Sequence, residues 1–305
     1  MSTAAPLSGH QYTISHGDYS ATIASVGASL RLLTFKGRDL VVPFDADEVR
    51  PAFRGATLAP WPNRIVGGSY EFQGTRYDVA WTEPKNGHAL HGLAGWLDFL
   101  LVAQTETELV LEAVIPAQAG YPWQVTVTVT NTVTDAGLAT TVTATNNTAT
   151  AAPWGTGPHP YLVAGPGRVD DWTLELPAAQ VLLTTETLAP TEVVAVESAG
   201  LDWREPHPIG DVFIDHAYTG LVRDSAGTAT VRLTDASGSG VQMSWGGDCP
   251  WVQIHTADQQ DPAVHRIGLA VEPMTCPPDA FNSGTDLVVL QPGGSSSARW
   301  TIAAL

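Results

Sequence analysis

The chain has 305 residues, of which 44% are apolar and 15% charged, a balance that excludes an intrinsically disordered protein. Lys and Arg number 14 against 31 Asp and Glu, which gives a formal net charge of −17. Because no basic surface is available to attract polyanions, nucleic acid, anionic membranes and polyanionic substrates are disfavoured as partners. The same acidity also suits a protein that only needs to stay in solution.

Signals for export or membrane insertion are not found in the sequence. The first ten residues lack both the basic and the apolar region of a signal peptide. No apolar run approaches the ~20 residues that a membrane-spanning helix needs. Two cysteines, Cys249 and Cys276, are too few for a disulfide scaffold and are not spaced as a metal-binding pair. We therefore expect a cytoplasmic protein.

Strand-forming residues dominate most of the chain. The expected strands cover residues 12–14, 19–26, 30–35, 70–72, 108–115, 124–133, 138–145, 172–176, 229–234, 241–245, 251–255, 267–271, 285–290 and 298–302. Residues 124–133 alternate valine and threonine, the period-two pattern of a half-buried strand. The turn at Asp135 to Gly137 joins this strand to 138–145, so the two are expected to form a hairpin.

The fold class follows from the number and spacing of these strands. With 29 Gly and 22 Pro, no convincing amphipathic helix longer than two or three turns is found. Many short strands separated by turns indicate a sandwich or a barrel. No linker or shift in composition marks a boundary, so residues 1–305 are expected to form one large all-β domain. An exposed edge strand can pair with a second copy or stay free, so the pattern sets no oligomeric state.

A histidine and a glutamate stand out in chemically suggestive contexts. His159 lies in a glycine- and proline-rich segment, and Glu272 follows an apolar run; each is followed at once by a proline. A strand that ends in a polar residue before a proline is expected to present that side chain at the rim of a sheet. An imidazole and a carboxylate at such rims make an acid–base pair. If Glu272 is buried among its apolar neighbours, its pKa rises and it becomes a better base.

Further polar side chains follow stiff or apolar segments. Asn63 and Arg64 come after a Pro-Trp-Pro stretch, His91 lies between a leucine and a glycine, and Asp215 follows an apolar run. Each has an ordinary structural explanation: a surface ion pair for Arg64, a hydrogen-bonded core residue for His91, and a turn or cap for Asp215.

Taken in chain order, these segments resemble the aldose 1-epimerase (galactose mutarotase) family. The resemblance runs from about residue 26 to the C-terminus, and no single piece is decisive. Its pieces are residues 55–65, 86–92, 120–123, 158–161, 201–204, 215–218 and 250–256, together with Glu272 and residues 278–282. The resemblance implies a large β-sandwich, the galactose mutarotase-like supersandwich, with an open sugar cleft and few short helices.

The resemblance also implies roles for individual residues. His159 corresponds to the general acid on the ring oxygen, and Glu272 to the base that takes the proton of the anomeric hydroxyl. The remaining matched residues correspond to positions that hold the sugar hydroxyls: Asn63, Arg64, His91, Asp215 and, with a weaker match, Gln253 and Tyr161. The implied activity is the interconversion of the α and β anomers of a free aldose such as glucose or galactose.

Ring opening and reclosure explain why these residue types are needed. A proton leaves O1 while another reaches O5, and each positioned acid or base contributes roughly 10²–10⁴-fold. Neither a metal, a nucleotide nor a covalent intermediate is required, so no cofactor is expected. Arg64 could donate a forked pair of hydrogen bonds to vicinal hydroxyls, and Asp215 could accept a pair. Trp61 and Trp154 lie closest to the motifs and are candidates for stacking on the sugar ring.

Departures from the family pattern lie beside the expected sugar site. Pro160 follows His159 where many members have serine, Leu93 follows Gly92 where a second glycine is frequent, and His255 stands where tyrosine is often found. These departures bear on the identity of the sugar more than on the reaction.

Three other readings remain open at this point. The first is a metal site built from His88, His91, His255 and His265, although carboxylate support is not obvious. The second is hexose-6-phosphate 1-epimerase activity, for which only Arg50, Arg54 and Arg64 gather near a motif. The third is a non-catalytic sugar-binding protein, which has no reason to retain both His159 and Glu272.

Overall fold

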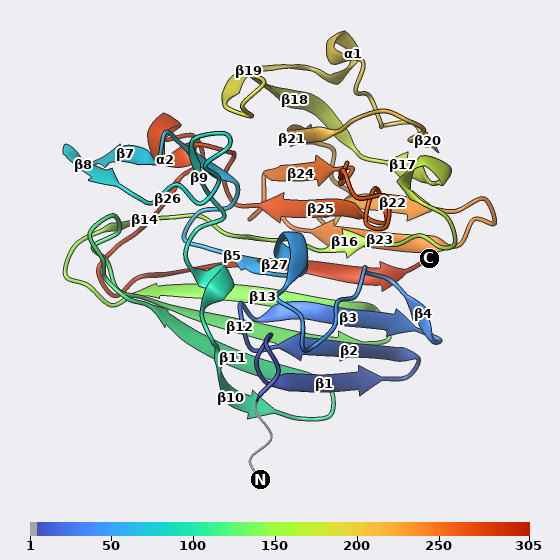
Figure 1. The fold of residues 1–305 in the computed structure, drawn as a ribbon, viewed down its shortest axis with the longest axis horizontal. Coiled ribbons are helices and arrows are strands. Elements are labelled where there is room, and N and C mark those ends of the chain that lie inside the picture. Colours follow the sequence, from blue (N-terminus) through green and yellow to red (C-terminus); the bar gives the residue numbers. More distant parts are fainter. Residues whose placement is uncertain (1–4) are drawn as a thin grey trace.

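Three antiparallel sheets form most of the computed structural model, which describes residues 5–305 (Figure 1). Residues 1–4, part of the segment inspected for a signal peptide, lie outside the described residues. The four-stranded sheet contains β1 (Gln11–His16), β2 (Tyr19–Ala24), β3 (Ser29–Phe35) and β4 (Arg38–Asp39). The nine-stranded sheet contains, in spatial order, β10 (Leu100–Gln104), β11 (Glu108–Ile115), β12 (Val125–Thr134), β13 (Gly137–Asn146), β27 (Ser295–Ala304), β23 (Gly240–Trp245), β22 (Ala229–Thr234), β17 (Thr173–Glu175) and β20 (His207–Pro208).

The six-stranded sheet carries most of the chemistry described below. Its order is β16 (Tyr161–Leu162), β25 (Leu269–Met274), β24 (Trp251–His255), β21 (Asp215–Leu221), β18 (Ala178–Thr184) and β19 (Pro190–Ala195). Four strand pairs complete the fold: β14 (Ala152–Trp154) with β26 (Val288–Leu290), β15 (Gly157–Pro158) with β5 (Thr57–Leu58), β6 (Arg64–Val66) with β9 (His88–Leu90), and β7 (Ser69–Phe72) with β8 (Thr75–Asp78).

Helices are few and short. The two α-helices are α1 (Val196–Ala199) and α2 (Ala280–Ser283), and the 3₁₀ turns are η1 (Pro51–Phe53), η2 (Ala94–Trp96) and η3 (Val169–Asp171). No helix among residues 5–305 is both long and apolar enough to cross a membrane. The expected all-β sandwich fold with few short helices is therefore confirmed.

The core lies between the sheets, where alternating side chains meet. In β12 buried and half-buried residues alternate along the strand, and β2 packs against β12 and β13. Ile23 from β2 and Val127 and Val129 from β12 belong to one buried cluster. The 124–133 and 138–145 hairpin is confirmed, with Asp135 and Ala136 as the two-residue loop between β12 and β13. The division of the chain into one domain stays a prediction.

Two differences from the expected strands have physical reasons. β18 was not expected because a register shift between Leu182 and Thr184 interrupts the alternation of its side chains. β25 was expected to end before Pro273 but continues to Met274. On the Pro273 side of β25, Val271 and Thr275 donate their N–H groups to the 156–160 segment rather than to β24. Because N–H groups point to alternate sides along a strand, the N–H position of Pro273 faces the 156–160 segment, as those of Val271 and Thr275 do. The N–H that Pro273 lacks therefore removes no hydrogen bond to β24.

Candidate functional site

One cavity of about 250 Å³ collects all eight residues expected at the site. It lies over the six-stranded sheet and beside the β6–β9 pair. Its lining consists of Ala52, Phe53, Asn63, Arg64, Glu83, Leu90, His91, His159, Tyr161, Leu188, Asp215, Gln253, His255, Gln259 and Glu272. Residues that are more than 200 positions apart in the chain therefore meet in one pocket.

Glu272 lies inside β25 rather than at a strand end, which corrects the expectation of a rim position. Its side chain is 2% exposed, and every residue of β25 is buried. Gln253 on β24 is its register partner. Burial among apolar groups and the nearby charge of Asp215 raise the pKa of Glu272 well above 4.5, although the charge of Arg64 opposes the shift.

His159 lies in the short break between β15 and β16. Main-chain bonds fix this segment, because Gly55 N–H donates to the His159 carbonyl and His159 N–H donates to Ala56. The imidazole lies between two aromatic rings, with Tyr161 at 5.1 Å and Phe53 at 6.4 Å between centroids. Burial, and then the neighbouring His255, lower the pKa of His159 to about 3.

The acid and the base expected from the sequence lie side by side. His159 Nε2 is 3.4 Å from Glu272 Oε1 in the cavity. Burial favours the neutral imidazole and the neutral carboxylic acid over the ion pair. Burial therefore opposes a charge on either member of the pair.

Several buried polar atoms around the cavity have no hydrogen-bond partner within the protein. Among residues 5–305 these include His159 Nδ1, Glu272 Oε2, Gln253 Oε1 and His255 Nδ1. Each unpaired buried group costs folding free energy, so a cluster of four in one cavity is unusual. A polar ligand that fills the cavity would supply the missing partners.

Asp215 and Gln253 form a polar wall on neighbouring strands. Gln253 Nε2 donates to Asp215 Oδ1 at 2.7 Å, which leaves Asp215 Oδ2 and Gln253 Oε1 as acceptors. Asp215 is the first residue of β21 and pairs in register with His255 on β24. His255 Nδ1 lies 3.7 Å from Asp215 Oδ1, so a third polar side chain belongs to the same wall.

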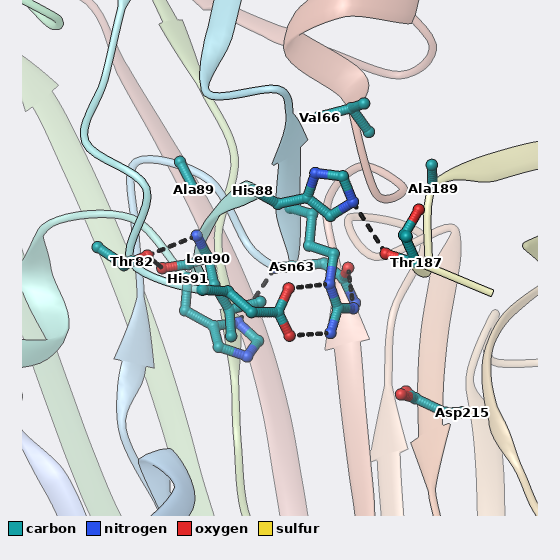
Figure 2. Close-up of polar contacts among 12 residues, drawn as sticks. Asn63, Val66, Thr82, His88, Ala89, Leu90, His91, Thr187, Ala189 and Asp215 are labelled. Atoms are coloured by element: carbon teal, nitrogen blue, oxygen red, sulfur yellow. Dashed lines mark hydrogen bonds and ion pairs between the residues drawn. The ribbon is translucent and has the colours of Figure 1, made fainter. Parts of the chain in front are cut away.

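Asn63 and His91 hold each other in unusual backbone conformations. Both have positive φ, 54° and 62°, and they lie together in Figure 2. His91 N–H donates to the Asn63 carbonyl at 2.7 Å, and Asn63 N–H donates to His91 Nδ1 at 3.2 Å. Because Nδ1 accepts, the ring hydrogen is on Nε2, which makes His91 a hydrogen-bond donor to a ligand. Burial and the neighbouring His159 keep the pKa of His91 well below 6.5.

Arg64 is engaged by a carboxylate that the sequence analysis did not identify. Its Nε and Nη2 donate to Glu83 at 2.8 and 2.9 Å, and its Nη1 donates to Asn63 Oδ1 at 3.1 Å. The expected fork toward vicinal sugar hydroxyls is thus occupied by Glu83. Two N–H groups remain, one on Nη1 and one on Nη2. Burial acts to raise the pKa of Glu83, but the hydrogen bonds and charge of Arg64 outweigh it and lower that pKa.

The aromatic wall of the cavity differs from the expected one. Trp61 and Trp154 are 3% and 1% exposed and do not line the cavity, so the expectation that they stack on a sugar is wrong. Phe53 lines the cavity instead, in edge contact with His91 at 4.7 Å. Tyr161 also lines it, but its hydroxyl donates to the Ala52 carbonyl at 3.2 Å, so its ring supports His159 more than it binds hydroxyls.

Glu83, Phe53 and Leu188 were missed because no local pattern marks them. Glu83 comes just before the His88 to Gly92 segment, Phe53 lies between two arginines, and Leu188 lies at a hairpin tip. The available signal for Glu83 was its charge beside a histidine-rich segment. The positions of Phe53 and Leu188 in the cavity depend on tertiary packing, which no local pattern reveals.

The four histidines considered for a metal site do not gather. His88 and His265 contact main-chain groups of Thr187 and Gln259, whereas His91 and His255 line the cavity. Within the part of the chain that the structure describes, no group of three or more His, Cys, Asp and Glu side chains is placed to hold a metal ion.

Comparisons with known proteins converge on one family. The sequence model of the aldose 1-epimerase family matches residues 10–303. YihR of Escherichia coli (strain K12), named as an uncharacterized protein, is 36% identical over 287 residues, which cover 94% of this chain and 90% of YihR.

Solved structures with low sequence identity share the fold. The GalM/aldose epimerase homologue from C. elegans has a TM-score of 0.85 at 22% identity and covers 97% of this chain and 99% of its own. The galactose 1-epimerase from Lactobacillus acidophilus NCFM has a TM-score of 0.81 at 15% identity, with 96% and 94% covered.

Proposed function

Since this chain belongs to the aldose 1-epimerase family, we propose that it interconverts the α and β anomers of a free aldose by acid–base ring opening and reclosure. His159 and Glu272 are the proposed catalytic pair. Asn63, Arg64, His91, Asp215 and Gln253 are proposed to hold the sugar, with Tyr161 supporting His159.

The spacing of the catalytic pair carries this proposal. O1 and O5 of a cyclic aldose are bonded to the same carbon, C1, so groups that exchange protons with them must lie close together. His159 Nε2 and Glu272 Oε1 are 3.4 Å apart in a buried cavity lined by hydroxyl-binding side chains. Geometry of this kind suits proton transfer at two oxygens of one carbon.

The proton balance of the reaction needs only this pair. The Glu272 carboxylate takes the proton of O1–H while the C1–O5 bond breaks. The electron pair of that bond goes to O5, which takes a proton from the His159 imidazolium, and the open aldehyde results. Rotation about C1–C2 exposes the other face of the carbonyl, and the reverse transfers close the ring.

The pair holds one proton before ring opening, as imidazolium and carboxylate, and one proton after it, as imidazole and carboxylic acid. Burial favours the second arrangement, and hydrogen bonds from the bound sugar are proposed to support the charge separation of the first. The assignment of His159 to O5 and of Glu272 to O1 follows the family resemblance.

The cavity favours a single uncharged sugar ring. Its volume of about 250 Å³ is below the ~300–1,000 Å³ typical of pockets for drug-sized ligands. Three carboxylates line it, those of Glu83, Asp215 and Glu272, and among the described lining residues Arg64 is the one Lys or Arg.

Neither remaining arginine supports the hexose-6-phosphate alternative. Arg50 is buried and bonded to Ser29 Oγ and to main-chain carbonyls, and Arg54 donates to the Pro43 carbonyl. Because Glu83 already pairs with Arg64, a phosphate would meet more negative than positive charge.

Polarimetry on freshly dissolved α-D-glucose and α-D-galactose tests the proposal. Wild type should accelerate the approach to equilibrium, and Glu272→Gln should lose roughly 10²–10⁴-fold in rate while it still binds sugar. Glu71→Gln, an exposed glutamate on β7, is the matched control and should behave as wild type. Acceleration of glucose 6-phosphate alone would replace the proposal with the phosphate alternative, and binding without acceleration would indicate a sugar-binding protein.

A further inference from the structure

The tip of the β18–β19 hairpin reaches the cavity with a residue in a disfavoured conformation. Thr185 N–H donates to the Ala189 carbonyl and Leu188 N–H to the Thr185 carbonyl, each at 2.9 Å. This is a three-residue hairpin loop whose last position is left-handed, a position that glycine usually fills. Leu188 occupies it with a φ of 64°, and its side chain lines the cavity. A left-handed leucine costs ~1–2 kcal/mol, so the backbone at this position is strained.

The strand order places this tip at the end of the cavity away from the catalytic pair. Glu272 is on β25, and β24 and β21 lie between it and the β18–β19 hairpin. A sugar whose C1 and O5 contact Glu272 and His159 therefore directs its far side toward Leu188. In a six-membered ring, C4 is the atom opposite C1.

A buried histidine ties the hairpin tip to the opposite wall. His88 is 4% exposed on β9, and its Nε2 lies 2.8 Å from the Thr187 carbonyl (Figure 2). Gly67 N–H donates to His88 Nδ1 at 3.2 Å, so the ring hydrogen is on Nε2 and Nε2 donates to Thr187. This bond joins segments 99 residues apart and fixes the residue next to Leu188.

We propose that Leu188, positioned by His88, determines specificity by closing the end of the cavity opposite C1, so that the protein accepts monosaccharides and rejects 4-O-linked disaccharides. This inference rests on the proposed mutarotase function. A second ring attached at O4 would have to leave the cavity through the space that Leu188 fills. Glycine at this position would open that space and also suit the turn better.

The experiment compares mutarotation of α-D-glucose with that of α-lactose, in which a galactosyl group is linked to O4 of glucose. Wild type should favour glucose strongly. Leu188→Gly should raise the ratio of kcat/KM for lactose to that for glucose at least about tenfold. Leu188→Gly is expected to fold as well as wild type, because it relieves the left-handed backbone.

Variants of Gln73 and His88 distinguish the loss of the Leu188 side chain from a general effect of a glycine substitution. Gln73→Gly makes the same backbone change at an exposed residue with a φ of 51° that does not line the cavity, and it should leave the ratio within about twofold of wild type. His88→Ala should raise the ratio as Leu188→Gly does. His88→Gln, whose amide can still donate to the Thr187 carbonyl, should restore the wild-type ratio.

Equal use of glucose and lactose by wild type, or an unchanged ratio in Leu188→Gly, would overturn the assignment of Leu188. No acceleration of any aldose would instead overturn the mutarotase function. The role of Leu188 is then decided by the rise in Tm that glucose and lactose produce in wild type and Leu188→Gly. If lactose raises the Tm of Leu188→Gly but not that of wild type, Leu188 closes the cavity as proposed. If lactose changes the Tm of both proteins equally, the proposal is refuted.

Discussion

The two sides of the cavity differ in how many of their polar groups have hydrogen-bond partners within the protein. Around the six-stranded sheet, His159 Nδ1, Glu272 Oε2 and Gln253 Oε1 are buried without partners. On the β6–β9 side, the Arg64 fork is filled by Glu83, and both ring nitrogens of His88 are bonded. The first side therefore has several polar atoms without partners, whereas on the second side most donors of Arg64 and both ring nitrogens of His88 are bonded within the protein. The proposed catalytic groups therefore lie around the six-stranded sheet, and the bonds that fix the shape of the cavity lie around the β6–β9 pair.

This difference predicts different responses to mutation. Groups without partners cost stability in the empty protein, so their removal should affect turnover more than folding. Groups that are already paired hold the wall in place, so their removal should affect affinity and folding together.

The largest effect is expected for the unpaired side. His159→Ala should lower kcat by roughly 10²–10⁴-fold, because the proposed proton donor to O5 is lost. The change is measured by polarimetry, with the exposed His10→Ala as the control. If His159→Ala kept more than about a tenth of the wild-type rate, its catalytic role would be wrong.

The paired side should respond mainly through sugar affinity. Arg64→Ala should raise KM at least as much as it lowers kcat, and it should lower stability because Glu83 loses its partner. Glu83 is partly exposed, so the loss should be smaller than the ~3–5 kcal/mol of a fully buried pair. The double variant Arg64→Ala/Glu83→Ala should recover part of that stability, which thermal unfolding can measure. Additive losses would mean that the two residues do not act as a pair.

A pH-dependent stability difference should distinguish Glu272 from its amide. The folded pKa of Glu272 is raised well above 4.5, so the folded state binds the proton more tightly than the unfolded state. Its contribution to stability is complete below about pH 4.5 and is lost as the pH rises through the folded pKa. Glu272→Gln cannot titrate. Its Tm should therefore rise relative to that of wild type as the pH increases above about 5. A difference in Tm independent of pH would contradict the raised pKa.

The smallest effect is expected for Tyr161→Phe. The variant loses one hydrogen bond, to the Ala52 carbonyl, but keeps the ring that stacks on His159. We expect a loss of ~0.5–1.5 kcal/mol in unfolding free energy and a rate within a few-fold of wild type. Calorimetry and polarimetry measure the two quantities. A rate loss comparable to that of Glu272→Gln would show that the hydroxyl itself contacts the reacting sugar.

The sequence predicted the residues of the site better than their surroundings. His159, Glu272, Asp215 and Gln253 belong to motifs, and all of them line the cavity. The position of Glu272 within its strand could not be predicted, because Pro273 is tolerated only where its missing N–H faces the 156–160 segment rather than β24.

Long-range partners were beyond the reach of local patterns. The pairing of Arg64 with Glu83 and the bond from His88 to Thr187 depend on which segments the sheets bring together. Trp61 and Trp154 are buried in the core. A core tryptophan cannot be distinguished by sequence from a tryptophan in a binding site. The predicted cytoplasmic location stays a prediction.

The short distance between His159 and Glu272 also limits what this cavity can do to larger carbohydrates. Hydrolysis of a glycosidic bond by inversion needs acid and base groups ~6.5–9.5 Å apart, because a water molecule must fit between the base and the anomeric carbon. At 3.4 Å the pair leaves no place for that water. A glycoside, moreover, has no hydrogen on O1 for a base to remove. The spacing of this pair therefore suits proton transfer at a free anomeric hydroxyl and not inverting cleavage of a glycosidic bond.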